Sequence, residues 1–232
     1  MHFFRNALGE IDYPTTDGEP MGETDLHRDM MIDLIEALRH YFSHDPNVYV
    51  SGNILLYYEE GNPLAHLSPD VLVTLGIEKV RRESYKLWEI GKAPEVVVEV
   101  TSRSTRLRDV GVKKGLYEAI GVKEYILFDP RNEYLMPRFQ VFRLESGSYI
   151  PCLVPETVGY PSLLGLTFQV VKNTLRIFET KSGKILPTPA ELSARIVEEQ
   201  HKAEAERQKA EVERQRAERL AEQLRRLGID PE

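Results

Sequence analysis

The stretch Pro94-Glu95-Val96-Val97-Val98-Glu99-Val100-Thr101-Ser102 lies near the middle of the chain and decides the fold. It begins with a strand breaker, ends where the sequence turns polar, and contains four valines. Such a run of β-branched residues predicts a strand that is buried on both faces of a sheet. Glu99 interrupts the valines, and a carboxylate inside an apolar strand is costly unless a cation or several donors satisfy it.

Two further segments complement this strand. Upstream, Ser68-Pro69-Asp70-Val71-Leu72-Val73 places an acid at the start of a second apolar strand. Downstream, residues 106–120 predict a helix that carries Lys113 and ends at Gly121. Two strand acids are hard oxygen ligands for Mg²⁺ or Mn²⁺, and a nearby lysine can orient water or stabilise developing charge. These groups are the parts needed to hold a divalent metal and a phosphodiester.

The composition is that of a globular protein with one main core. The chain has 232 residues, of which 41% are hydrophobic, and no apolar run approaches the roughly 20 residues of a membrane span. The first residues turn polar too soon for a signal peptide. A single cysteine, Cys152, excludes an intrachain disulfide and a cysteine-rich zinc site. We therefore expect a cytoplasmic protein with no membrane partner.

The distribution of charge says more about partners than the total does. A formal net charge of −7 argues against a protein that coats nucleic acid by bulk attraction. Residues 103–114, however, hold five basic residues and one acidic residue. Residues 79–92 hold five basic residues and two acidic residues. Positive charge therefore brackets the central strand. It could contact DNA, or it could belong to two solvated loops.

The order of predicted elements indicates an α/β fold with a mixed sheet. Residues 1–22 lack periodicity and are expected to form an N-terminal arm, and a helix is expected from Thr24 to about Ser43. Strands are predicted at the following residues: 48–50, 53–58, 70–75, 94–101 and 123–129. The last two flank the helix at 106–120, which has the length of a crossover and predicts parallel neighbours. Short β segments between residues 139 and 179 are expected to flank this sheet.

The character of the chain changes after Pro187. Residues 190–228 are rich in Ala, Glu, Arg and Gln, and one heptad seam runs through Ile196, Ala203, Ala210, Ala217 and Leu224. Three glutamates on the companion seam argue against tight coiled-coil packing in the middle. We expect a long, solvated helix that supports weak self-association, with a homodimer as the predicted assembly.

An ordered set of motifs resembles the Uma2 family, a group of restriction-endonuclease-like proteins with the PD-(D/E)xK nuclease fold. The motifs are Ser68-Pro69-Asp70, Glu99-Val100-Thr101-Ser102-Arg103-Ser104-Thr105, then Asp109, Lys113 and Tyr117, then Gly121-Val122-Lys123-Glu124-Tyr125 and Asp129-Pro130. The resemblance covers about residues 20–180. It implies a restriction-endonuclease-like domain over residues 23–186.

The resemblance also implies roles for individual residues. Asp70 and Glu99 take the places of the two metal-binding acids, with Mg²⁺ or Mn²⁺ as the cofactor. The lysine expected two positions after the second acid is replaced by Thr101, and Lys113 on the following helix is expected to act instead. A further acidic ligand often comes from the first helix of this fold, and Glu23 is the candidate, with His27 one turn later. DNA is the expected substrate.

Each of these residues also has a structural explanation. Asp70 could cap a turn after Pro69, and Glu99 could be neutralised by an internal arginine or by backbone donors. Lys113 could pair with Asp109 on an exposed helix face. Three hydroxyl residues are expected to cap the helix first and to contact phosphate second, namely Ser102, Ser104 and Thr105. His27 is expected to be an ordinary member of the first helical turn.

Two functions from different classes follow. The first is a metal-dependent endonuclease that hydrolyses DNA phosphodiester bonds. The second is a catalytically silent module on a nuclease fold that binds nucleic acid or protein, which the absent Glu-x-Lys pattern and the acidic surface favour. A scaffolding role for the long helix is a third possibility.

Overall fold

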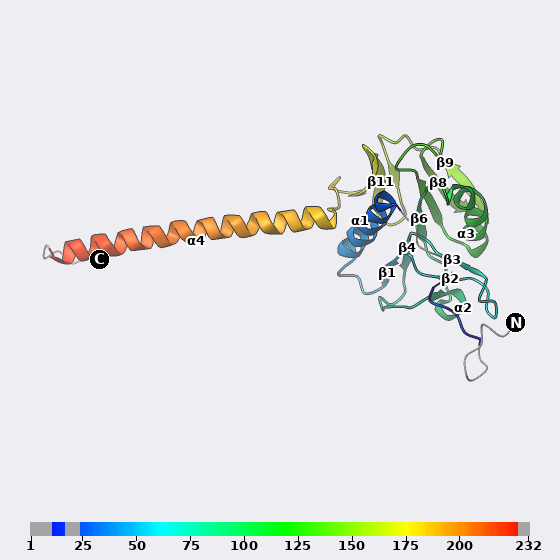
Figure 1. Cartoon of the computed structure of the whole chain (residues 1–232), viewed down its shortest axis with the longest axis horizontal. Coiled ribbons are helices and arrows are strands. Elements are labelled where there is room, and N and C mark those ends of the chain that lie inside the picture. The colour runs from blue at the N-terminus through cyan, green and yellow to red at the C-terminus, as the bar shows by residue number, and fades with distance from the viewer. Residues whose placement is uncertain (1–10, 17–23, 227–232) are drawn as a thin grey trace. The chain divides into compact units, whose positions relative to one another are not determined.

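The computed structural model describes residues 11–16 and 24–226, and the chain divides into two compact units at Leu186/Pro187 (Figure 1). The helices are α1 (Asp25–Tyr41), α2 (Leu87–Ile90), the π-helical turn η1 (Arg108–Lys113), α3 (Lys114–Ile120) and α4 (Pro189–Arg226). The strands are β1 (Val48–Ser51), β2 (Leu56–Tyr57), β3 (His66–Leu67), β4 (Val71–Leu75), β5 (Tyr85–Lys86), β6 (Val96–Val100), β7 (Glu124–Phe128), β8 (Phe139–Glu145), β9 (Ser148–Cys152), β10 (Tyr160–Pro161), β11 (Leu166–Val171) and β12 (Thr174–Glu179).

A six-stranded mixed sheet forms the centre of the first unit. Its strands follow the order β1-β4-β6-β7-β8-β9, in which only β6 and β7 pair in parallel. The parallel pair confirms the crossover expected from residues 94–129. All five residues of β6 are buried, as the valine run predicts. The predicted α/β fold with a mixed sheet is therefore confirmed.

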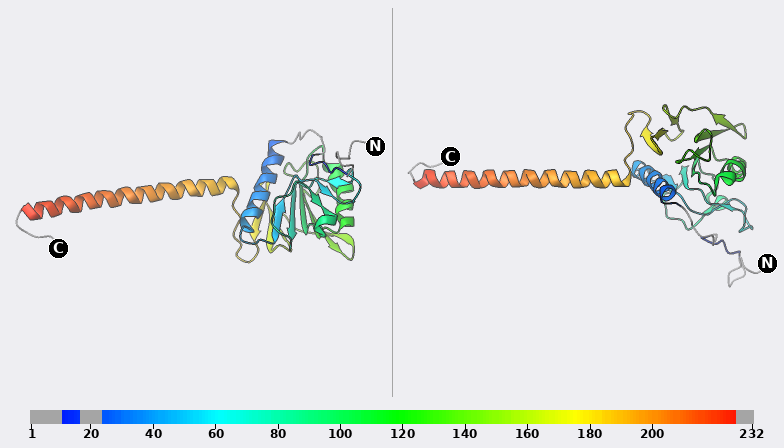
Figure 2. Two further views of the ribbon diagram at one scale, coloured as in Figure 1. Left: turned by 90° about the horizontal axis from the view of Figure 1, so that it is seen from below. Right: turned by 45° about the horizontal axis from the view of Figure 1, so that its top comes forward.

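The two faces of the sheet have different covers. Alternate residues of β6 point to opposite sides, so Val96, Val98 and Val100 join one core cluster and Val97 joins another. The first cluster includes α1 and the small sheet β10-β11-β12, and the second includes α3 and the small sheet β3-β2-β5. Figure 2 shows α1 lying along one side of the central sheet. Glu99 shares its face with Val97, so it lies on the side of α3.

Helix α1 forms where the sequence predicts it. Thr24 is the N-cap, as expected, and its hydroxyl accepts a hydrogen bond from the amide of His27 at 3.3 Å. The apolar side of the helix, including Leu34 and Leu38, is buried in the first cluster. This packing holds the N-terminus of α1 near the start of β4, where the first acid lies.

Two expectations about elements need correction. The segments expected to flank the main sheet divide between two sheets, because β8 and β9 extend the central sheet itself while β10–β12 form a separate one. The helix expected at residues 106–120 is present, but its middle part, η1, is π-helical rather than α-helical and is followed by α3. Asp109 and Lys113 of the site described below both lie in this π-helical turn.

Helix α4 matches the solvated helix expected after Pro187. Its 38 residues are mostly exposed, among them Ile196, Val197 and Val212 on its apolar positions. Ion pairs such as Lys202–Glu198 and Arg226–Glu222 connect successive turns. Within the described residues, no helix combines the length and the apolar character that crossing a membrane demands.

Candidate active site

Two acids from neighbouring strands meet at one end of the central sheet. The antiparallel register pairs Val71 of β4 with Val98 of β6, and one further step of that register sets Asp70 opposite Glu99. Residues opposite each other in such a pair have Cβ atoms about 4.5–5.5 Å apart. The amide of Val100 donates a hydrogen bond of 2.7 Å to Asp70 Oδ2, which fixes the first carboxylate beside the second acid.

Glu99 is fully enclosed, with 1% of its surface exposed. The Tyr117 hydroxyl donates to Oε1 at 2.8 Å and the Lys113 ammonium donates to Oε2 at 2.7 Å. Burial raises the pKa of the Glu99 carboxyl well above its ordinary value, and Asp70 and Asp109 add to the effect while Lys113 opposes it. A neighbouring cation is what would allow this carboxylate to remain ionised.

Asp70 is held from two sides. His27 Nε2 lies 3.0 Å from Oδ2, the same oxygen that accepts the Val100 amide. Gly52, between β1 and β2, lies against its backbone, and a Cβ atom at that position would be only 2.0 Å from the Asp70 carbonyl oxygen. Glycine at position 52 is therefore needed for Asp70 to occupy its place.

Lys113 is the last residue of the π-helical turn and reaches the acids from there. Its ammonium is buried, contacts Glu99, and lies 3.4 Å from both Asp109 Oδ1 and the Ser68 carbonyl oxygen. Burial alone lowers the pKa of Lys113, but Glu99, Asp70 and Asp109 together outweigh it and raise the pKa above its ordinary value. The lysine is therefore a fixed positive charge in the site.

Asp109 is the least satisfied group in this cluster. Its side chain is 1% exposed, and among the described residues neither carboxylate oxygen accepts a hydrogen bond of good geometry, although Thr105 and Lys113 lie close enough to lower its pKa. The Lys113 ammonium lies 3.4 Å from Oδ1. Burial raises the pKa of the Asp109 carboxyl, with Lys113 opposing the shift. An unsatisfied buried carboxylate costs free energy, and such a group marks a functional position more often than a structural one.

The balance of charge fits a divalent cation. Three carboxylates, those of Asp70, Glu99 and Asp109, surround one ammonium, and even a protonated His27 would leave one negative charge in excess. Carboxylate oxygens are the ligands that Mg²⁺ and Mn²⁺ prefer. Within residues 11–16 and 24–226, however, no group of three His, Cys, Asp or Glu side chains is placed so that it could hold a metal ion, so an ion here would be held by fewer protein ligands or after movement of these side chains. Glu23, the third ligand expected from the sequence, lies outside the described residues.

The structure brings together Asp70, Glu99 and Lys113, which the sequence analysis singles out as site residues. Sequence reasoning missed the role of His27, which it assigns to an ordinary helical turn, although the histidine contacts Asp70 across 43 residues of chain. It also left Asp109 as a partner of Lys113 on an exposed helix face, whereas both side chains are buried. The spacing of four residues between Asp109, Lys113 and Tyr117 was a usable signal, because it places all three on one side of a helix.

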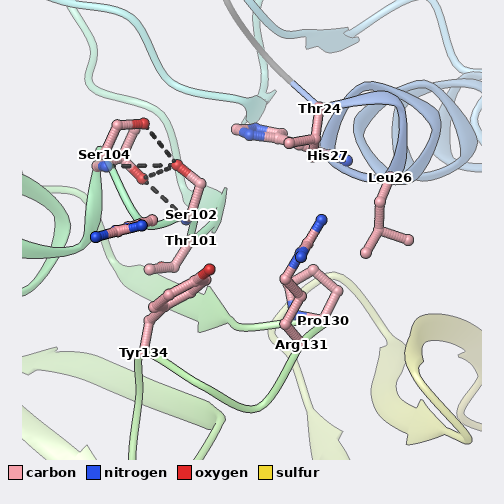
Figure 3. Close-up of a pocket in the computed structure, with 11 residues that line it drawn as sticks. Thr24, Leu26, His27, Thr101, Ser102, Ser104, Pro130, Arg131 and Tyr134 are labelled. Atoms are coloured by element: carbon pink, nitrogen blue, oxygen red, sulfur yellow. Dashed lines mark hydrogen bonds between the residues drawn. The ribbon is translucent and has the colours of Figure 1, made fainter.

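A pocket of about 610 Å³ opens beside these acids (Figure 3). It is lined by Thr24, Leu26 and His27 of the α1 start, by Thr101, Ser102, Arg103, Ser104 and Thr105 after β6, and by Pro130, Arg131 and Tyr134 after β7. Ser102 and Thr105 cap the start of the helical segment, since the Ser102 amide donates to Thr105 Oγ1 at 3.1 Å and the Thr105 amide donates to Ser102 Oγ at 3.4 Å. This confirms the expected capping role for Ser102 and Thr105, whereas the Ser104 hydroxyl contacts Ser102 Oγ at 3.0 Å.

The fold is that of an α/β protein with a mixed sheet, and the candidate site gathers two strand acids and a lysine at one end of that sheet. A profile of the family described as "Uma2: Putative restriction endonuclease" matches residues 6–178, which is most of the chain. The chain therefore belongs to the Uma2 family, in agreement with the resemblance of its motifs.

Solved structures and curated proteins give two further comparisons. One solved structure, described as "a putative nuclease belonging to DUF820" from Anabaena variabilis ATCC 29413, is 13% identical in sequence to this chain. The match covers 59% of this chain and 75% of that chain, with a TM-score of 0.40. A comparison with curated proteins gives no match.

Proposed function

We propose that this protein is a metal-dependent endonuclease that hydrolyses phosphodiester bonds of DNA. The observation that carries the proposal is the pairing of Asp70 with Glu99 across β4 and β6, with the Lys113 ammonium 2.7 Å from Glu99. Two buried acids on adjacent strands have no structural need for each other, because like charges placed opposite destabilise a sheet. A shared cation explains why the chain places them there.

In this proposal Asp70 and Glu99 hold the metal, with Mg²⁺ or Mn²⁺ as the ion. When bound, the ion supplies a nucleophilic water at neutral pH and neutralises charge on the scissile phosphate. His27 positions the Asp70 carboxylate, and the Tyr117 hydroxyl positions that of Glu99. Such partners of metal ligands commonly set ligand orientation and affinity.

Lys113 is the proposed catalytic cation. Its ammonium lies next to Glu99 and carries three donors, so it can hydrogen-bond to a phosphate oxygen or to the attacking water while keeping one carboxylate contact. Because its pKa is raised by the surrounding carboxylates, it stays charged as negative charge develops on the phosphate. A fixed cation at this position stabilises the transition state more than the ground state.

The nature of the substrate is supported by the charge around the site. Arg103, Arg106 and Arg108 are exposed on the segment that leads from β6 into η1, immediately beside the acids. A local basic segment on an acidic protein attracts a polyanion to one place without coating the whole surface. We place the activity in the cytoplasm, where DNA is available and the single free thiol of Cys152 would stay reduced.

The long helix supports a proposal about assembly. Ile196 and Val212 are exposed on α4, and an isolated helix gains most of its stability from packing. We propose a homodimer in which α4 helices pair weakly through the seam of Ile196, Ala203, Ala210 and Ala217. Two copies of the active site would then be available for a two-stranded substrate.

A second candidate function is a nucleic-acid-binding module without catalysis. The observation that favours it is the full occupation of Glu99, whose two oxygens already accept from Tyr117 and Lys113. In that case the lysine would replace the metal as the permanent counter-ion. Titration calorimetry with Mn²⁺ separates the two functions, because the module would take up no ion at these acids.

The test of the nuclease proposal is a cleavage assay on supercoiled and linear DNA with Mg²⁺ or Mn²⁺. Asp70→Ala combined with Glu99→Ala is expected to abolish metal-dependent cleavage, while circular dichroism reports that the fold persists. Glu95→Gln is a matched control, because Glu95 is also a buried acid next to β6 but pairs with Lys92 at the other end of the strand. Cleavage that continues at the wild-type rate in the double variant would rule the proposal out.

A further inference from the structure

We propose that the pocket of Figure 3 is a phosphate-binding subsite, which holds a second phosphate of the DNA strand beside the one that is cut. This inference rests on the proposed nuclease function and adds to it the position of the substrate backbone. We name this pocket the phosphate pocket.

The phosphate pocket lies next to the two proposed metal-binding acids, which are linked to it through residues of its lining. His27 lines it and also contacts Asp70 at 3.0 Å, and Thr101 lines it two residues after Glu99. The pocket and the Asp70 carboxylate therefore share the His27 side chain. Successive phosphates of a strand are close neighbours, so the two sites suit a single continuous backbone.

The lining of the pocket is basic and offers donors. Arg103 and Arg131 are exposed, and neither guanidinium forms a hydrogen bond or an ion pair with the residues that the structure describes. None of the lining residues is acidic. Figure 3 shows Arg131 extending from the β7 side toward the start of α1. Planar guanidinium groups without a carboxylate partner are well suited to bind phosphate oxygens in pairs.

Thr101 provides an independent observation inside the pocket. Its side chain is 2% exposed, and its hydroxyl has no hydrogen-bond partner among the described residues. A buried hydroxyl without a partner costs free energy, and valine would fill the same space without that cost. The hydroxyl is therefore explained by a ligand that reaches the inner wall of the pocket.

The rest of the pocket wall also favours the binding of a phosphate. Thr24 is the N-cap of the 17-residue helix α1, whose N-terminus carries partial positive charge toward the pocket. Ser102 and Ser104 place their hydroxyl oxygens 3.0 Å apart at the rim, where they can donate to further phosphate oxygens. A volume of about 610 Å³ exceeds the needs of a single phosphate group and leaves room for the attached sugar.

The experiment measures DNA binding in EDTA, so that neither metal nor cleavage enters the result. Fluorescence anisotropy with a 16-nucleotide single-stranded and a duplex DNA probe is followed across a range of salt concentrations. Arg103→Ala with Arg131→Ala is expected to weaken binding by about tenfold or more and to reduce the salt slope by about two. Lys181→Ala with Lys184→Ala is the matched control, since it removes two exposed positive charges from the turn after β12, outside the pocket.

Thr101→Val provides the second variant. This variant should bind the DNA probes a few fold more weakly, while its melting temperature stays the same or rises. A purely structural role of the Thr101 hydroxyl would not give both results. Titration calorimetry compares pTpT, which carries a terminal phosphate, with TpT, which has only the internal phosphodiester. Tighter binding of pTpT assigns the pocket to a terminal phosphate. Equal binding of the two dinucleotides assigns it to an internal phosphodiester.

Two results would overturn the phosphate pocket: a double arginine variant that loses no more affinity than its control, or a wild-type protein that binds none of these probes. Failure of the nuclease proposal looks different. In that case Asp70→Ala with Glu99→Ala leaves cleavage unchanged, while the binding measured in EDTA still depends on Arg103 and Arg131.

Discussion

Asp70 and Glu99 lie opposite each other across the antiparallel pair β4–β6, and the amide of Val100 donates to Asp70 at 2.7 Å. A single step of strand register separates this arrangement from one in which the two acids would face opposite sides of the sheet. The apolar alternation of β4 and β6 fixes that register, since Val71 and Val98 must both face the first core cluster. Packing of the core therefore determines the geometry of the site.

Removing Lys113 is expected to cost stability as well as activity. Lys113→Met leaves Glu99 and Asp109 buried without their counter-ion, and breaking a buried pair in this way lowers the free energy of unfolding by about 3 kcal/mol. Mn²⁺ should recover more stability in this variant than in the wild type, because the ion takes over the missing positive charge. Urea denaturation with and without Mn²⁺ measures both effects. Equal stabilisation of the two proteins by Mn²⁺ would contradict the account.

Replacing Asp109 is expected to raise stability while it lowers activity, unlike the replacement of Lys113, which lowers both. Asp109→Asn removes an unsatisfied buried charge and should raise the free energy of unfolding by about 1 kcal/mol, while it weakens metal binding and slows cleavage. Chemical denaturation and the cleavage assay report the two quantities separately. If the variant is less stable and fully active, Asp109 is an ordinary structural acid.

His27 is expected to affect metal binding through its contact with Asp70. His27→Gln should weaken Mn²⁺ binding by about tenfold or more, the usual effect of losing a partner of a metal ligand. His40→Gln is a matched control on the exposed end of the same helix. Calorimetric titration distinguishes them, and identical Mn²⁺ affinities for the two variants would remove His27 from the site.

The position of the lysine can be tested by moving it. Thr101 and Glu99 are two residues apart, so in extended backbone their side chains point to the same face. Thr101→Lys in the Lys113→Met background should restore part of the lost cleavage, because the ammonium then reaches the same acids from the strand. The rate of plasmid nicking provides the measurement. A double variant no more active than Lys113→Met would mean that the π-helical position is essential.

Truncation tests the role proposed for α4. Removing residues 190–232 should convert a dimer to a monomer in sedimentation experiments, while cleavage of short duplexes is retained by the remaining unit. A truncated protein that sediments as the full-length protein does would show that the dimer, if present, forms elsewhere.

Much of this fold can be predicted from residue patterns. The valine run around Glu99, the helix after Thr24 and the alanine-rich tail each carry strong local periodicity, and each appears in the structure as expected. Short strands such as β3 and β5 carry two residues each and leave no periodic signal. The π-helical turn could not be predicted either, because the sequence periodicity over Arg108–Lys113 does not distinguish a π-helix from an α-helix.

The site was predictable only in part for a related reason. Asp70 and Glu99 stand out because acids are rare inside apolar strands. The contact of His27 with Asp70 depends on how α1 packs on the sheet, and no local pattern encodes that packing. The burial of Asp109 likewise follows from the direction of the turn that precedes α3.

The central claim is that Asp70 and Glu99 jointly bind one divalent ion. Anomalous diffraction from crystals soaked in Mn²⁺ tests it most directly. The account predicts a single strong peak within about 2.1 Å of a carboxylate oxygen of each residue, with the Lys113 ammonium close by. No peak between the two acids, with Lys113 still bonded to Glu99 at saturating Mn²⁺, would contradict it.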